Sequence, residues 1–257
     1  MQTNNLLKLM AYSAALFCAM PASHAAEDDR DLEPFEAVNF SLPYSVEFVA
    51  ADRHYIEFDG DEDVIDDIKT RIKGDTLKVY KDSGGWFNWS EGNVVVTIGY
   101  VDLNSINLSG SGDGFAELIE TADLTLRITG SANMEMEAVV ADTVSISIAG
   151  SGNVEIHQLD ADQVTSKIAG SGDIELSGRA VEQEISIAGS GDLEAAELRT
   201  QETTAKVRGS GDIRVWAASR LGASVMGSGD VYYYGDPQSV KESVHGSGDV
   251  VHLGAAP

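Results

Sequence analysis

The tetrapeptide Gly-Ser-Gly-Asp, or a close variant of it, occurs eight times in this chain from residue 110 onward. The first glycines of the copies are residues 110, 130, 150, 170, 189, 209, 227 and 246, so the copies follow one another at a nearly constant spacing. A period of about 20 residues is typical of stacked structural units, each of which contacts mainly its neighbours. Leucine-rich repeats, short helical pairs and the coils of a parallel β-helix all fit this period.

The residues beside the tetrapeptide distinguish between these architectures. The residue two places before each first glycine is aliphatic, and the residue before that is polar. These aliphatic residues are Leu108, Ile128, Ile148, Ile168, Ile187, Val207, Val225 and Val244. Alternation of this kind is the pattern of a β-strand with one buried face. The Leu-x-x-Leu-x-Leu frame of leucine-rich repeats is missing, and helices would not tolerate two glycines per repeat.

We therefore predict an all-β fold, a single-stranded parallel β-helix with about 20 residues per rung. The tetrapeptide forms a corner, because glycine adopts positive φ angles without a steric penalty. Asp or Asn at its fourth position can cap the corner by accepting a bond from a nearby backbone N–H. A looser return, such as residues 159–164 or 178–183, is expected to complete each rung.

The chain divides into three segments on this interpretation. Residues 1–25 are predicted to be a signal peptide, because Lys8 precedes an apolar stretch and small residues stand at the cleavage positions before Ala26. Residues 26–257 are predicted to form a single domain. Within it, residues 26–105 form irregular first coils and an N-terminal cap, and residues 106–257 form the eight rungs. A cap is expected because an open β-helix end is an unpaired sheet edge.

Composition limits the location and the partners. The single cysteine, Cys18, lies in the predicted signal peptide, so the mature chain has no disulfide bond. No apolar run in the mature chain approaches membrane-spanning length. The formal charge of −25 argues against nucleic acid as a partner and favours cations or basic partners. We expect an extracytoplasmic protein, either periplasmic or secreted.

The most prominent candidate site is the column of corner carboxylates. Asp173, Asp192, Asp212, Asp230 and Asp249 would line one edge of the rod. Neighbouring carboxylates in such a column repel each other, so solvent, turn N–H groups or bound calcium must offset the charge. We expect these residues to act mainly as turn caps and treat a calcium-lined edge as the alternative. No other cofactor is expected, and no catalytic residues are identified.

Two further features offer binding surfaces. Trp86, Phe87 and Trp89 lie in a glycine-flanked insertion and either bind a ligand such as a sugar ring or pack over the first coil. The stripe Glu135, Glu155, Glu175 and Glu194 points outward and is either a solvated face or a docking surface. The histidines His54, His157, His245 and His252 are scattered and have no metal-ligand spacing.

Several phrases of the sequence resemble a known bacterial family. "FEAVNFSLPYSVEF", "GDTLKVY", "VDLNSINLSGSGD" and the serial GSGD rungs are similar to the family called putative auto-transporter adhesin, head GIN domain. The resemblance covers roughly residues 34 to 253. It implies a right-handed β-helix-like fold and a bacterial source, and it supplies no catalytic residues.

The leading functional interpretation is an exported, non-enzymatic binding or scaffold protein of the bacterial envelope, which is adhesin-like and binds an envelope glycan or protein. A regular rod offers repeated surface and no constellation of acid, base and nucleophile. The alternative is a polysaccharide-processing β-helix enzyme, a lyase or hydrolase, using carboxylates on one face. Such an enzyme needs long loops to build a cleft, and the nearly constant rung length leaves no room for them. The sequence leaves the ligand and the oligomeric state open.

Overall fold

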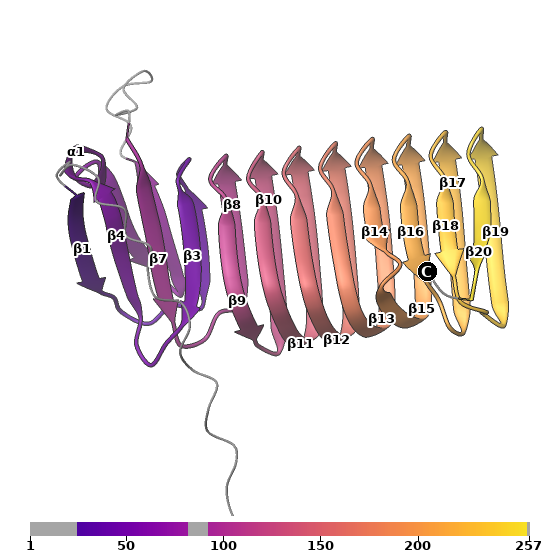
Figure 1. The fold of residues 1–257 in the computed structure, drawn as a ribbon, viewed down its shortest axis with the longest axis horizontal. Helices are drawn as coiled ribbons and strands as arrows, with labels where there is room; N and C mark the ends of the chain where they lie inside the picture. Colours follow the sequence, from indigo (N-terminus) through magenta and orange to yellow (C-terminus); the bar gives the residue numbers. More distant parts are fainter. Residues whose placement is uncertain (1–24, 82–91, 256–257) are drawn as a thin grey trace, which may run out of the picture.

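The computed structural model describes residues 25–81 and 92–255. Strands account for 72% of the structure and helix for 2%, and the strands coil into a parallel β-solenoid of about eight turns. Figure 1 shows the turns side by side along the long axis, from the indigo N-terminal end to the yellow C-terminal end. The predicted all-β, parallel β-helix fold is confirmed.

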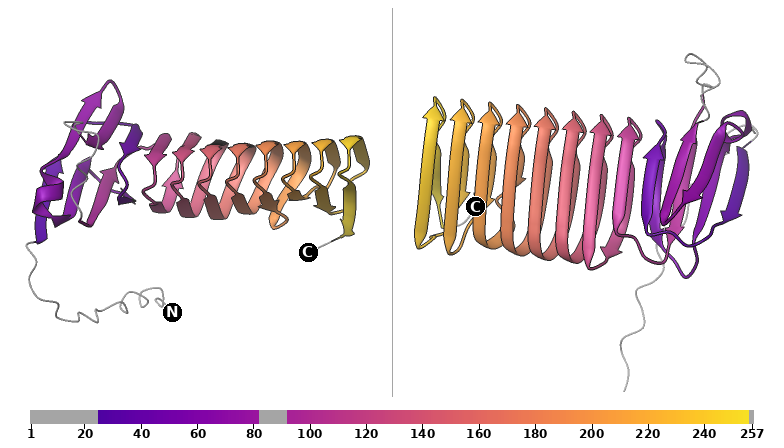
Figure 2. Two further views of the ribbon diagram at one scale, coloured as in Figure 1. Left: turned by 90° about the horizontal axis from the view of Figure 1, so that it is seen from above. Right: turned by 180° about the vertical axis from the view of Figure 1, so that it is seen from behind.

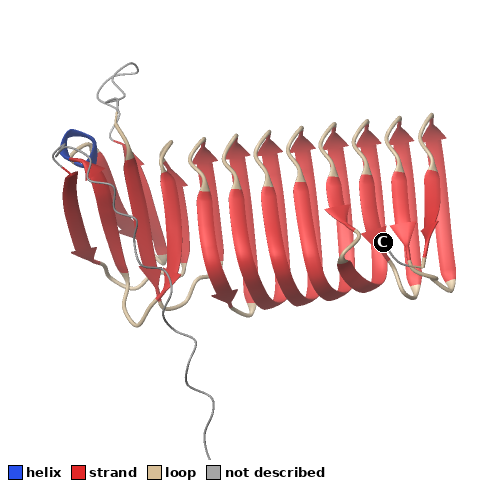
Figure 3. Ribbon diagram, in the orientation of Figure 1, coloured by secondary structure: helices blue, strands red, loops and turns tan. Residues whose placement is uncertain are grey.

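Each rung of the repeat consists of a strand before the GSGD corner and a strand after it. The strands are β8 (Ser105–Gly110), β9 (Gly114–Glu120), β10 (Asp123–Gly130), β11 (Met134–Gly150), β12 (Val154–Gly170), β13 (Ile174–Gly189), β14 (Leu193–Ala195), β15 (Leu198–Gly209), β16 (Ile213–Trp216), β17 (Arg220–Gly227), β18 (Val231–Tyr234), β19 (Ser239–Gly246) and β20 (Val250–Gly254). All of these strands pair in parallel with the equivalent strands of neighbouring rungs. In Figure 3 the corners appear as tan loops in one row along the upper edge.

The expectation of a loose return within each rung is wrong for the middle of the rod. There the chain continues from one corner to the next as a single strand of 17 residues in β12 and 16 residues in β13. Ala161 and Ala180, which pair in register, are buried where the return was expected. Their small side chains fit inside the bend, so the backbone turns without leaving the hydrogen-bonded ladder.

Aliphatic columns inside the coil form the core. Ile128, Ile148, Ile168 and Ile187 stand in register on successive rungs and are each at most 2% exposed. Burying one such side chain contributes roughly 1.5–3 kcal/mol. The alternation in the sequence therefore determines which face of each strand points inward.

Glycine at the corner is required by both conformation and space. Gly170 has a φ of +142°, and a Cβ placed there would lie 2.1 Å from the carbonyl oxygen of Gly150 on the preceding rung. Across the corner, Ser171 N–H donates to that same oxygen at 2.9 Å. The close stacking of the corners therefore leaves no room for a side chain at the first position.

The first coil of the rod comes from the segment that lacks the repeat. Strands β2 (Ala37–Ser41) and β3 (Ser45–Ala50) pair in parallel with β8 and β9, so they stack directly beneath the first GSGD rung. Strands β6 (Thr76–Lys81) and β7 (Val94–Tyr100) continue the parallel pairing on the other side of β2 and β3. The rod thus begins before the repeat becomes visible in the sequence.

Antiparallel strands cover the N-terminal end. Strand β4 (Tyr55–Asp61) pairs antiparallel with β7 and with β1 (Ala25–Asp31), and β5 (Ile68–Lys73) forms an antiparallel hairpin with β6. A single helical turn, α1 (Glu62–Ile65), joins β4 to β5. Figure 2 shows this region as a broader, differently oriented layer at one end of the narrow rod.

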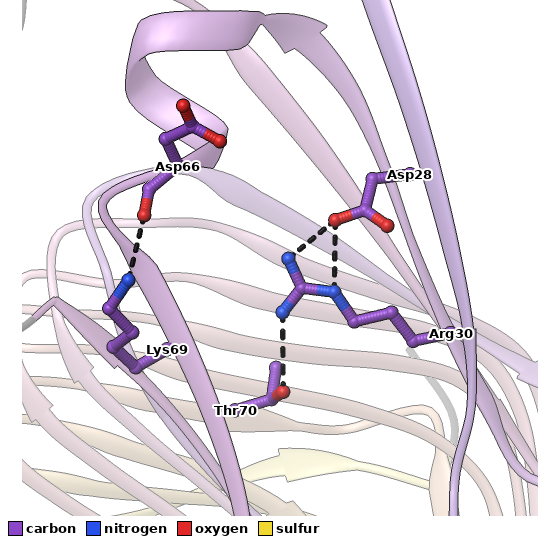
Figure 4. A network of polar contacts seen from close by, with 5 residues as sticks. All are labelled: Asp28, Arg30, Asp66, Lys69 and Thr70. Atoms are coloured by element: carbon purple, nitrogen blue, oxygen red, sulfur yellow. Dashed lines mark hydrogen bonds and ion pairs between the residues drawn. The ribbon is translucent and has the colours of Figure 1, made fainter.

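Polar contacts connect the strands of this cap. Arg30 on β1 donates to Asp28 at 2.9 Å and to Thr70 of β5 at 3.4 Å (Figure 4). Its guanidinium also lies 5.1 Å from the ring of Phe58. Lys69 donates to the carbonyl oxygen of Asp66 at 2.8 Å. One arginine therefore contacts the neighbouring strands β4 and β5 at once.

The C-terminal end has no such cover among the described residues. Every residue of β19 after Ser239 is exposed, including Val240 at 37% and Val244 at 41%. Glu242 pairs with Ala223, so it occupies a position that is apolar and buried in β15 and β17. The last rung therefore presents a charged side chain on the inward face of the coil.

Candidate functional site

The Asp and Asn side chains of the corners form one continuous ladder, but they do not cap their own corners. The side-chain Oδ1 of each ladder residue before the last accepts a hydrogen bond from the backbone N–H of the ladder residue on the following rung, at 2.7 to 3.1 Å. The ladder residues are Asp113, Asn133, Asn153, Asp173, Asp192, Asp212, Asp230 and Asp249. The expectation of a cap within the same corner is wrong, because the closely stacked rungs bring the next N–H within reach.

The ladder places the predicted calcium residues in one row at the edge of the rod. Six of the eight ladder positions are aspartates, and the five predicted calcium residues among them are Asp173, Asp192, Asp212, Asp230 and Asp249. In the first four of these, Oδ1 already accepts a backbone N–H bond. Asp173, Asp192 and Asp212 therefore keep their second oxygen for solvent or a cation, whereas the second oxygen of Asp230 accepts a hydrogen bond from the Tyr232 hydroxyl. A calcium-lined edge stays a prediction.

The structure describes one of the two other candidate sites. Trp86, Phe87 and Trp89 lie outside the described residues, as does the predicted signal peptide up to residue 24. The glutamate stripe is present: Glu135, Glu155, Glu175 and Glu194 stand in register on the outward side of four successive rungs. Like charges one strand spacing apart repel by about 1 kcal/mol in water.

This stripe belongs to a longer surface, which we call the post-corner face. It consists of the outward residues of the strands that follow the corners. Its first column contains Phe115, Glu135, Glu155, Glu175, Glu194, Arg214, Tyr232 and Val251. Two residues further along the same strands stand Glu117, Glu137 and His157 in the early rungs, and Trp216 and Tyr234 in the late rungs. The face therefore changes from acidic to aromatic and cationic along the rod.

A histidine lies among the carboxylates of the acidic part. His157 Nε2 lies 3.3 Å from Glu135 Oε1, and His157 Nδ1 lies 3.4 Å from Glu155 Oε1. One carboxylate oxygen of Glu137 completes a group whose ligand atoms lie within 4.8 Å of one another. The hydrogen bond with Glu135 and the nearby carboxylates of Glu155 and Glu137 raise the pKa of His157, although partial burial opposes them.

Sequence reasoning missed this cluster, because the scattered histidines have no local metal-ligand spacing. The signal that could have revealed the cluster is the spacing of the repeat. Glu137 and His157 are separated by one repeat, which puts them at the same position of adjacent rungs. Glu135 lies two residues before Glu137, on the same side of its strand.

The late rungs carry the arginine–aromatic patch, which we define as Arg199, Arg214, Trp216, Tyr232 and Tyr234. The Arg199 guanidinium lies 3.6 Å from the ring centroid of Trp216, and the Arg214 guanidinium lies 5.1 Å from that of Tyr232. Trp216 pairs with Tyr234 across the strands β16 and β18. All three aromatic side chains are half-buried, and both arginines are exposed.

Acidic partners hold this patch in place. Arg214 lies 3.3 Å from Glu194, and the Tyr232 hydroxyl donates to Asp230 at 2.9 Å. This hydrogen bond, together with desolvation, raises the pKa of Tyr232. Arg214 is therefore positioned by a carboxylate on one rung and by a ring on the next.

An open groove of about 560 Å³ lies between the corners, at the return bend of the early rungs. It is lined by Glu120, Asp142, Asp160 and Asp162 among alanines and Val140. Arg179 forms a bidentate ion pair with Asp160 and lowers the pKa of that carboxyl. One of the four carboxylates is thus already neutralised, and beyond these carboxylates the lining offers the hydroxyl of Thr121 and apolar side chains.

No helix in residues 25–81 and 92–255 is long and apolar enough to span a membrane.

Comparisons with known proteins agree with this geometry. Residues 34–237 match the sequence profile of the family described as "putative auto-transporter adhesin, head GIN domain". A crystal structure of a putative lipid binding protein from Parabacteroides distasonis shares 25% identity, with 89% of this chain and 96% of that chain covered and a TM-score of 0.83. No curated protein matches the chain.

Two solved putative adhesins have the same fold. One from Parabacteroides merdae shares 21% identity over 89% of this chain and 96% of that chain, with a TM-score of 0.84. One from Parabacteroides distasonis shares 21% identity over 89% and 97% of the two chains, with a TM-score of 0.81.

Proposed function

Because this chain belongs to the family described as putative auto-transporter adhesin, head GIN domain, we propose that it is an exported, non-enzymatic, adhesin-like binding protein whose post-corner face binds a basic protein surface. The observation that carries the proposal is the arginine–aromatic patch at the end of the glutamate column, on one rigid face of the solenoid.

The patch has the composition of a protein-binding anchor. Trp, Tyr and Arg are the residues that most often dominate interface energetics, and they are enriched in interface cores. Here Trp216 and Tyr234 are held side by side by strand pairing, and Arg199 stacks on Trp216. A surface that is already ordered loses little conformational entropy when a partner binds.

The glutamate column determines which charge the partner's surface must carry. Glu135, Glu155, Glu175 and Glu194 line the approach to the patch on a chain of formal charge −25. Such a column attracts a basic surface and raises its association rate, an effect that salt screens. Cations of the partner would meet Glu175, which stands beside Glu194 in the column, and its apolar side chains would contact Trp216 and Tyr234.

The experiment compares three forms of residues 26–257 as bait for envelope extracts. The first is wild type, and the second combines Trp216→Ala with Tyr234→Ala. The third is a control that combines Arg208→Ala with Met226→Ala, an exposed and paired couple on the pre-corner strands. Melting temperatures establish that all three are folded.

We expect wild type and the control to retain the same basic protein, with retention falling as salt increases. The Trp216/Tyr234 variant should lose it. Equal retention by all three forms would show that the post-corner face is not the binding surface.

A further inference from the structure

We propose that Glu135, Glu137 and His157 form a binding site for a divalent transition-metal ion of the zinc type, with Glu155 orienting the histidine ring. The site lies on the outward side of two adjacent strands. Glu135 and Glu137 project from β11, and Glu155 and His157 project from β12. The pairing of Glu135 with Glu155 fixes their register.

The distances suit a single ion. Zinc binds histidine nitrogen and carboxylate oxygen at about 2.0–2.2 Å, so two ligands of a tetrahedral ion lie about 3.3–3.5 Å apart. His157 Nε2 and Glu135 Oε1 are 3.3 Å apart. The three ligand atoms lie within 4.8 Å of one another, so Glu137 becomes the third ligand when its oxygen moves closer to the other two on binding.

The second ring nitrogen faces a carboxylate, as is usual for metal-binding histidines. Such histidines usually bind the metal through one nitrogen and donate the other N–H to a carboxylate or carbonyl, which fixes the tautomer. Here Nε2 faces Glu135, while Nδ1 lies 3.4 Å from Glu155 Oε1. Of the three carboxylates, those of Glu135 and Glu137 therefore act as ligands, and that of Glu155 positions the histidine ring.

The donor set also selects the metal. Calcium prefers oxygen ligands, whereas imidazole together with carboxylate suits zinc, copper or nickel. Binding would also relieve the repulsion among three carboxylates on a strongly acidic chain. The site is therefore chemically distinct from the calcium edge considered for the corner aspartates.

The test uses untagged residues 26–257, because a polyhistidine tag would itself bind zinc. Isothermal titration with ZnCl₂ measures affinity, and the visible absorption of the Co²⁺ form reports coordination geometry. The variants are His157→Gln, Glu137→Gln and Glu155→Gln. His245→Gln removes an exposed histidine from the last rung and serves as the matched control.

We expect one zinc ion per chain, bound equally by wild type and His245→Gln and not by His157→Gln. Glu137→Gln should weaken binding and change the Co²⁺ spectrum. Glu155→Gln should lower affinity by about 10–100-fold without removing the site. Absence of zinc binding by wild type, or unchanged affinity in His157→Gln, would overturn the proposal.

Melting curves in EDTA establish that each variant is folded. The proposed site shares Glu135 and Glu155 with the glutamate column of the proposed function, but the two are tested separately, because the partner-capture experiment can be run in EDTA and the zinc titration needs no partner. A negative outcome in one experiment therefore does not decide the other.

Discussion

The Oδ1 atom of Asp173 accepts a hydrogen bond from the backbone N–H of Asp192, one rung further along the rod, at 2.7 Å. The same bond recurs between every consecutive pair of ladder residues from Asp113 to Asp249. Two backbone bonds accompany it at each corner, as in Ser171 N–H to the Gly150 oxygen and Val154 N–H to the Asp173 oxygen. The repeated aspartate therefore joins rungs and does not merely close a turn.

The first prediction separates these two roles. Asp192→Ala should lower the free energy of unfolding by about 0.5–2 kcal/mol, because the N–H of Asp212 loses its acceptor. Asp249→Ala is the matched control, since no described rung follows it, and it should cost far less. Urea titrations measure both. Equal losses would instead indicate that each aspartate caps its own corner.

Asparagine should be a good replacement at the same position. Asn133 donates to Asp113 Oδ1 through both its backbone N–H and its Nδ2, at 3.0 and 2.9 Å, and Asn153 repeats the arrangement. Asp192→Asn would add such a bond and remove one charge from the ladder. We expect it to be neutral or to stabilise the protein slightly in the same urea titrations, and a loss comparable to that of Asp192→Ala would contradict this.

Calcium should have little effect on the ladder. One oxygen of Asp173, Asp192, Asp212 and Asp230 is already engaged by a backbone donor. We expect millimolar calcium to leave the melting temperature nearly unchanged. A clear rise that is abolished when Asp192→Asn and Asp212→Asn are combined would establish a calcium-lined edge, since a ligand that binds only the folded state stabilises it by mass action.

The sequence predicts the rod well because its signal is periodic. Ile148 and Ile168 are separated by one repeat, and both their burial and their pairing follow from that spacing. The antiparallel pairing of β4 with β7 and β1 could not be predicted, because alternation alone does not specify strand direction. The cluster around His157 was missed for a related reason, since its members come together only through the register of two rungs.

Another prediction concerns a polar side chain in the core. Gln183 stands in register with Val164 and is 2% exposed, and neither of its amide atoms has a hydrogen-bond partner in the structure. An unpartnered buried amide costs roughly 1–3 kcal/mol. Gln183→Leu should therefore raise the free energy of unfolding by up to about that amount.

Gln163→Leu is the control for this substitution, because Gln163 is exposed on the adjacent rung and its replacement should change stability by no more than about 0.5 kcal/mol. Chemical denaturation measures both variants. A loss of stability in Gln183→Leu would mean that the amide has a structural role that its contacts do not reveal.

A tyrosine connects the cap to the first rung. The Tyr100 hydroxyl at the end of β7 donates to the carbonyl oxygen of Leu118 at 2.7 Å, and burial raises its pKa from 10.0 to about 12. The unfolded chain therefore releases this proton first as pH rises, and folded-state stability should fall between pH 10 and 12. Tyr100→Phe should cost about 0.5–1.5 kcal/mol at neutral pH and flatten this alkaline decline. An unchanged alkaline profile would contradict the assignment.

The last prediction concerns β19, the outermost pre-corner strand among the described residues. Glu242 occupies the inward column in which Ile185 and Ala205 are 0% and Ala223 is 3% exposed, and it is flanked by the exposed Val240 and Val244. Inward-pointing charges protect sheet edges from pairing with another chain, because stacking would bury the charge without a partner. Glu242→Val should remove this protection and let a second copy pair through β19. Light scattering after size-exclusion chromatography should then show a larger, concentration-dependent mass than that of wild type.

The control is Lys241→Val, which adds the same side chain on the outward side of β19 and should leave the mass unchanged. If Glu242→Val elutes as wild type does, or if Lys241→Val associates equally, the inward charge is not what keeps the rod ends apart.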